Sequence, residues 1–120
     1  MTCVWDSLVA GLRGLPDAPA SPAQLLLAVQ TNNAPPRNVT RNNTPFTERQ
    51  CAEVFDAISV TKISASGYDC AACDPLLAAV CQLYTVNINH NFGGACMRYA
   101  VPQPRRTFAL TSSTSHMSLS

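Results

Sequence analysis

Residues 69–120 read DCAACDPLLAAVCQLYTVNINHNFGGACMRYAVPQPRRTFALTSSTSHMSLS, and this stretch decides the predicted fold. A helix is expected to begin at Asp74-Pro75, because Asp is a preferred N-cap and Pro is favoured at the first helical position. The apolar positions of this helix recur at helical spacing, and they are Leu76, Leu77, Val80, Leu83 and Tyr84. The chain then changes to short runs separated by Gly and Pro, which predicts a helix followed by several strands.

Short strands are expected throughout the rest of this stretch. Residues 86–89 alternate apolar and polar side chains, as a half-buried strand does. A turn is expected at 91–94, which ends in two glycines, and a break at 102–104, which contains two prolines. The expected strands are 86–89, 97–101, 107–110 and 116–119.

Three further helices are expected in the N-terminal half. The first contains Cys3 in its first turn and ends near Gly11 and Gly14. The second begins at Ser21 and the third at Thr47, and each shows the capping-box pattern of Ser or Thr followed three residues later by Gln. Apolar residues at helical spacing support the first and third helices: Val4, Trp5, Leu8, Val9, Leu12, Cys51, Val54, Phe55 and Ile58.

The remaining segments are expected to be irregular or short. Residues 31–45 are rich in Asn, Pro and Thr and predict a loop. Residues 60–63 predict a short strand, and 64–67 a turn. Because helices come first and a small, mainly antiparallel sheet follows, the sequence predicts one α+β domain over residues 1–120.

The charge of the chain argues against a nucleic-acid partner. Only 12% of its 120 residues are charged and the net charge is +1, whereas nucleic-acid binding depends on many Lys and Arg residues that neutralise phosphates. A hydrophobic content of 47% indicates a globular domain. The sequence has no apolar run near the roughly 20 residues that span a bilayer, and we expect no signal peptide.

The six cysteines are interpreted as free thiols, because we expect no export and a core of this size needs no disulfides. A zinc site is the alternative, and its ligands would come from Cys70, Cys73, Cys81, Cys96 and His90. Only the first two form a Cys-x-x-Cys pair, and Cys81 falls on the apolar face of its predicted helix. We therefore favour structural thiols.

Cys3 and His116 are the candidate catalytic residues. A cysteine nucleophile needs a base within hydrogen-bond reach, which keeps it a thiolate and later protonates the leaving amine. Cys3 stands at the head of a predicted helix, where unpaired N–H groups and the helix dipole favour a thiolate. His116 stands on the last predicted strand. This combination is typical of papain-like cysteine peptidases.

The order of these motifs resembles the ovarian tumour (OTU) family of deubiquitinating cysteine proteases. The segment DPLLAAVCQLYTVNI (74–88) is similar to the helix-then-strand signature of that family. TFAL (107–110) and SHMSL (115–119) are similar to its strand and catalytic-histidine region, and CVWDSL (3–8) to its nucleophile helix. The small size and the sequence around His116 look most like the viral, tymovirus-type branch of polyprotein proteases.

The resemblance implies a compact papain-like α+β fold with N-terminal helices packed on the sheet. It implies Cys3 as the nucleophile, His116 as the base, and the backbone N–H groups of Cys3 and Val4 as oxyanion donors. Members with a catalytic triad often carry Asp or Asn two residues after the histidine. Ser118 stands there, and a serine supplies no negative charge, so a Cys–His dyad is implied with Ser118 as a candidate supporting residue.

The resemblance also implies two activities, namely cleavage of a viral polyprotein and removal of ubiquitin from conjugates. The substrate would be an extended peptide ending in small residues, often Gly-Gly, which fit a narrow channel. The implied partners are ubiquitin, a polyprotein cleavage-site peptide and other replication proteins. The chain would act as a monomer without a cofactor, in the host cytoplasm or at membrane-associated replication sites. Segments 91–94 and 111–115 are candidate site loops.

Other polar residues receive structural interpretations. His90 is a rival base, but we interpret it as a turn histidine, and Arg105-Arg106 as a solvated turn. Trp5 is interpreted as a core residue. Two alternatives to an OTU-like enzyme stay open: a non-catalytic zinc-binding or interaction domain of a viral protein, and a different papain-like viral leader protease.

Overall fold

The computed structural model describes residues 3–58, 74–112 and 117–119. Its helices are α1 (Cys3–Leu12), α2 (Pro22–Thr31), α3 (Glu48–Ala57) and α4 (Asp74–Tyr84). Its strands are β1 (Thr40–Arg41), β2 (Thr44–Pro45), β3 (Asn87–Phe92), β4 (Ala95–Ala100), β5 (Thr107–Ser112) and β6 (Met117–Leu119). The α+β class predicted from the sequence is therefore confirmed. The expected strand at 60–63 and turn at 64–67 lie outside the described residues.

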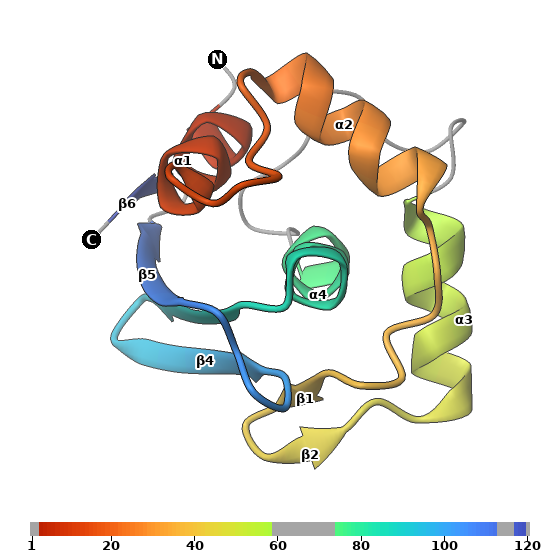
Figure 1. Ribbon diagram of the computed structural model, residues 1–120. Coiled ribbons are helices and arrows are strands. Elements are labelled where there is room, and N and C mark those ends of the chain that lie inside the picture. Colours follow the sequence, from red (N-terminus) through yellow and green to blue (C-terminus); the bar gives the residue numbers. More distant parts are fainter. Residues whose placement is uncertain (1–2, 59–73, 113–116, 120) are drawn as a thin grey trace.

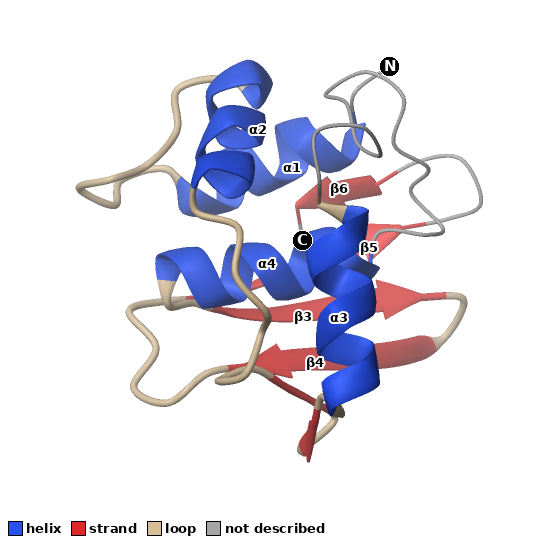
Figure 2. Cartoon of the chain, turned by 90° about the vertical axis from the view of Figure 1, so that its right-hand side faces the viewer, coloured by secondary structure: helices blue, strands red, loops and turns tan. Residues whose placement is uncertain are grey.

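The strands form one mixed sheet in the order β2-β1-β4-β3-β5-β6. Strands β3 and β5 are parallel, with Asn87 opposite Thr107 and Phe92 opposite Ser112. The other described strand pairs are antiparallel, so the prediction of a mainly antiparallel sheet is confirmed. Figure 2 shows α1, α2 and α4 on one side of β3 and β4.

Helix α4 lies at the centre of the fold, with α1, α2, α3 and the sheet arranged around it (Figure 1). Its buried residues occupy every side of the helix, as a helix inside a core requires: Leu76, Leu77, Ala78, Ala79, Val80, Cys81 and Tyr84. Cys81 is therefore a core residue, as the apolar pattern predicts. Within the described residues, no helix has the length and apolar character needed to cross a bilayer.

The predicted helix starts are confirmed in detail. The Ser21 hydroxyl accepts a hydrogen bond from the Gln24 backbone N–H at 3.2 Å. At α3 the full capping box is present: the Thr47 hydroxyl accepts from the Gln50 backbone N–H at 3.1 Å, and the Gln50 side chain accepts from the Thr47 backbone N–H at 2.9 Å. These bonds satisfy backbone donors that a helix start leaves without intrahelical partners.

The predicted loop at 31–45 is wrong in its last part, because residues 40–45 form the β1–β2 hairpin. Its two turn residues, Asn42 and Asn43, have φ values of 51° and 65°, which is the left-handed conformation that a tight hairpin turn requires. Asn tolerates this conformation better than most residues. The Asn42 side chain also accepts from the Arg98 backbone N–H at 2.8 Å, which attaches the hairpin to β4.

The predicted turn at 91–94 is too long. Strand β3 continues through Phe92, and only Gly93 and Gly94 turn the chain, with φ values of 57° and 84°. Two glycines suffice because a two-residue hairpin turn needs positive φ at both positions. As a consequence, His90 lies within β3 and not in a loop, which corrects its interpretation as a turn histidine.

The interpretation of Arg105-Arg106 as a solvated turn is incomplete: Arg105 is exposed in a bend, but both side chains also bind backbone carbonyls. The Arg105 guanidinium donates to the Tyr84 carbonyl at the end of α4, at 2.9 Å from Nε and 2.6 Å from Nη2, and to the Asp17 carboxylate at 3.1 Å. The Arg106 guanidinium donates to the carbonyls of Gly11 and Arg13 at 3.1 and 2.5 Å. Both cations therefore stabilise the carbonyl ends of helices, where the dipole is negative.

Candidate functional site

Helix α1 and strand β6 pack against each other. Helix α1 begins at Cys3, and β6 begins at Met117, the residue that follows His116 in the chain. The helix and the strand are in contact, and Figure 1 shows them side by side at the edge of the sheet. The first helix and the last strand of the described chain are thus brought together, as the predicted site requires.

The fold fixes the position of α1 on this edge. Trp5 and Leu8 are fully buried, which anchors the helix in the core and confirms the prediction for Trp5. Gly11 faces the ring of Phe108 on β5 so closely that a Cβ at Gly11 would lie 2.4 Å from a ring carbon. The helix is therefore packed at backbone distance against the sheet, and its far end accepts hydrogen bonds from Arg106.

The electrostatics of the first turn of α1 suit an anion. The first N–H groups of a helix, here those of Cys3 and Val4, have no intrahelical carbonyl partner and lie at the positive end of the dipole. A thiolate at the helix start gains from this field. The exposed Asp6 carboxylate lies in the same turn and contributes a negative charge there.

Several predicted site residues are not placed by the structure. His116 lies outside the described residues, as do Cys70, Cys73 and loop residues 113–115. The backbones of Cys3 and Ser118 are described as parts of α1 and β6. Residues 91–92 and 111–112 of the predicted site loops belong to strands β3 and β5.

A buried polar pair beside this region was missed by the sequence analysis. His90 Nε2 and Ser112 Oγ are 2.6 Å apart, and the two residues are only 9% and 5% exposed. Both lie on the face of the sheet that also carries the buried residues Ile88 and Leu110. The signal in the sequence was the alternation Ile88, His90, Phe92, which continues the apolar face through the histidine.

The described cysteines fall into two environments. Cys51 and Cys81 are buried, whereas Cys96 is exposed on β4. Burial in the core raises the pKa of the Cys81 thiol, and a hydrogen bond with the Ile88 backbone offsets only part of that effect. A protonated core thiol is a poor metal ligand. Among the described residues, no three His, Cys, Asp or Glu side chains gather as a metal site would require.

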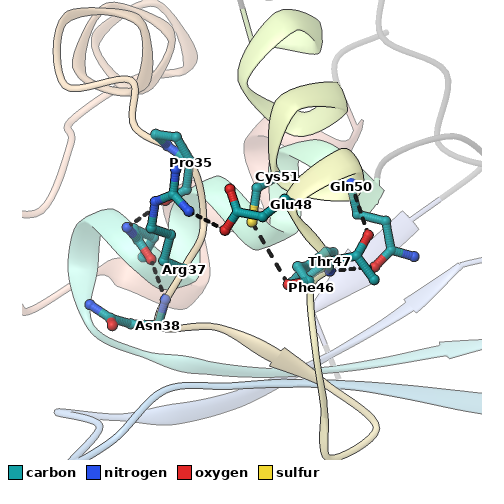
Figure 3. Close-up of polar contacts among 9 residues, drawn as sticks. Pro35, Arg37, Asn38, Phe46, Thr47, Glu48, Gln50 and Cys51 are labelled. Carbon is teal, nitrogen blue, oxygen red and sulfur yellow. Dashed lines mark hydrogen bonds and ion pairs between the residues drawn. The ribbon is translucent and has the colours of Figure 1, made fainter.

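A shallow apolar cavity of about 260 Å³ lies on the α3 side of the molecule. Its lining consists of Pro35, Arg37, Glu48, Cys51, Ala52 and Phe55. Figure 3 shows the ion pair between Arg37 and Glu48 at its rim and the contact of the Cys51 thiol with the Phe46 carbonyl. None of these lining residues belongs to α1 or β6.

Comparison with protein-family models, with curated proteins and with solved structures gives no match for this chain. The structure itself establishes the α+β fold and the packing of α1 against β6.

Proposed function

We propose that this chain is an OTU-like cysteine peptidase in which Cys3 is the nucleophile and His116 the general base and then acid. The observation that supports the proposal is the packing of α1, which starts at Cys3, against β6, which starts one residue after His116. A dyad built from opposite ends of a chain requires such a contact between its carrier elements.

The proposed reaction begins with attack of the Cys3 thiolate on the scissile carbonyl carbon. The carbonyl oxygen becomes an oxyanion, which the backbone N–H groups of Cys3 and Val4 stabilise. The His116 imidazolium donates its proton to the leaving amine, and a thioester forms. Water, deprotonated by His116, then attacks the thioester and restores the free thiol. Ser118 would support the histidine through a neutral hydrogen bond.

The fold supplies the rigidity that this chemistry needs. Catalytic groups must be held near their reactive geometry, since a displacement of about 1 Å costs up to about a hundredfold in rate. Trp5, Gly11 and the Arg106 guanidinium attach α1 to the core and to the sheet at three points along the helix. Cys3 thus starts a helix that cannot shift without disturbing the core.

The proposed substrates follow from the resemblance. They are peptides ending in small residues, in a polyprotein and at the C-terminus of ubiquitin, and the proposed setting is the cytoplasm of an infected cell. Residues without bulky side chains can extend through a narrow channel to the nucleophile. The net charge of +1 leaves recognition to shape and backbone hydrogen bonds more than to long-range attraction.

A ubiquitin probe with a C-terminal electrophile tests the proposal. Wild type should form a covalent adduct, and Cys3→Ala and His116→Ala should not. Cys96→Ala removes an exposed thiol from β4 and is the matched control, which should react like wild type. An adduct that persists in Cys3→Ala, or no adduct in any variant, would overturn the proposal. One bound zinc per chain with an unreactive Cys3 would instead support a zinc-binding domain.

A further inference from the structure

We propose that His90 and Ser112 are positioning residues that fix the end of β5, and with it the start of β6, for the reaction at Cys3. This inference rests on the proposed function, because it concerns the strand end beside His116. Neither residue is assigned a role in the chemistry itself. Their contribution is to hold the start of β6, the strand that follows His116 in the chain.

The pair joins the interior of one strand to the terminus of another. His90 lies inside β3, which is paired on both sides, with β4 and with β5. Ser112 is the last residue of β5. Because β3 and β5 run parallel with His90 opposite Leu110, Ser112 lies two residues further along the same face. The 2.6 Å contact is therefore a diagonal link within the sheet.

The link acts at the end of a strand. Strand ends open more readily than strand interiors, because fewer ladder bonds and contacts restrain them. Both side chains of the link are at least nine-tenths buried, so water does not compete for the hydrogen bond. The terminal residue of β5 is thereby tied to the centrally placed β3.

The restraint extends to β6 through backbone pairing. Ser112 lies opposite Met117, the first residue of β6, and Leu110 lies opposite Leu119. His116 is the residue before Met117 in the chain. A movement of the β5 end is therefore expected to move the start of β6 as well. Helix α1, which begins at Cys3, packs on the same strand.

The test separates positioning from stability with four variants. Ser112→Ala and His90→Leu each remove one partner, and the double variant Ser112→Ala/His90→Leu removes both. His90→Gln keeps a polar nitrogen at the place of Nε2. Thr107→Ala, at the exposed start of β5, is the control. The readouts are kcat and KM for a ubiquitin substrate, the melting temperature, and the pH profile of Cys3 alkylation by iodoacetamide.

We expect the single variants to lower kcat about tenfold with little change in KM, and to shift the alkylation profile of Cys3 to higher pH, as a displaced base would. The double variant should lower kcat no further than either single variant, because each single variant already breaks the same hydrogen bond. His90→Gln should recover part of kcat. If kcat follows melting temperature across all variants, or stays at the wild-type level, the positioning role is wrong.

The outcome also distinguishes this inference from the proposed function. If His116→Ala abolishes turnover while Ser112→Ala behaves like Thr107→Ala, the peptidase assignment stands and the positioning role fails. If wild type does not turn over substrate and Cys3 alkylation is the same in His116→Ala, the proposed function fails, and the positioning role fails with it.

Discussion

The backbone of Gly11 in α1 lies against the ring of Phe108 in β5, so that a Cβ at Gly11 would come within 2.4, 2.5 and 2.8 Å of three ring carbons. No side chain other than hydrogen fits there without movement of the ring or the helix. This contact sets the distance between α1 and the sheet.

Gly11→Ala should therefore destabilise the protein by about 1–3 kcal/mol, the usual cost of overpacking. The direction of this change in stability is informative, because helix propensity alone predicts the opposite. An alanine in a helix interior stabilises a protein by about 1 kcal/mol relative to glycine. Urea unfolding measures the effect. Gly11→Ala/Phe108→Val, which removes the ring, should recover most of the loss. A stabilised Gly11→Ala protein would contradict the close packing of α1 on β5.

Arg106 should contribute to stability through the end of α1. Arg106→Gln removes a cation that donates to the Gly11 and Arg13 carbonyls, and hydrogen bonds from charged groups contribute about 1.5–3 kcal/mol. We expect the free energy of unfolding in urea to fall by about that amount. Arg98→Gln, at an exposed arginine of β4, is the control and should change stability by less than about 0.5 kcal/mol. Equal losses of unfolding free energy in the two variants would argue against stabilisation of the end of α1 by Arg106.

Thr85 offers a stabilising substitution. It follows α4 with φ of 57°, a left-handed conformation that is costly for a β-branched residue. Its N–H donates to the Cys81 carbonyl at 3.0 Å, which a glycine would retain. Thr85→Gly should raise the free energy of unfolding by up to about 1 kcal/mol. The control Thr107→Gly, in β5, should lower the free energy of unfolding. A destabilised Thr85→Gly protein would show that the Thr85 side chain has a stabilising role of its own.

The pH dependence of stability should reveal the buried thiol of α4. Burial raises the pKa of Cys81 in the folded state, whereas the unfolded thiol titrates near about 8.5. Above that pH the unfolded state loses a proton that the folded state keeps. Stability is therefore fully present below about pH 8.5 and falls by about 1.4 kcal/mol per pH unit above it. Tyr84, whose pKa is raised by burial and by the Asp17 carboxylate, adds to the decline near pH 10 and above.

Urea unfolding between pH 7 and 10.5 under reducing conditions measures this decline. Cys81→Ala should lose stability at neutral pH, because the core loses volume, but decline less steeply as the pH rises. Cys96→Ala removes a thiol from an exposed position and controls for the loss of one cysteine. Identical slopes in Cys81→Ala and wild type would contradict a protonated thiol in the core.

The helices could be predicted closely from the sequence because their signals are local. Ser21, Thr47 and Asp74 mark their starts within a residue, and apolar spacing identifies the faces that enter the core. Such signals depend on neighbours three or four residues away, which a single sequence displays directly.

The strands and the polar pair were harder to predict because their partners lie far apart in the chain. The Asn42-Asn43 turn lacks the glycine of the commonest hairpin signal, so the sequence around it predicts a loop and not the β1–β2 hairpin. The burial of His90 is not visible in its local sequence, because Ser112 is 22 positions away and becomes a neighbour only through parallel strand pairing. The contact between α1 and β6 likewise depends on the whole fold, so spacing alone could not establish it.

The outermost position of β2 limits how other chains can bind. Pro45 has no backbone N–H to donate, and β2 contains only two residues, so this border of the sheet is a poor template for strand addition. The opposite border, β6, spans three residues and contacts α1. Self-association by edge-to-edge pairing is thus disfavoured at the β2 border, and a bound peptide would have to be recognised elsewhere than by prolonging the sheet at β2.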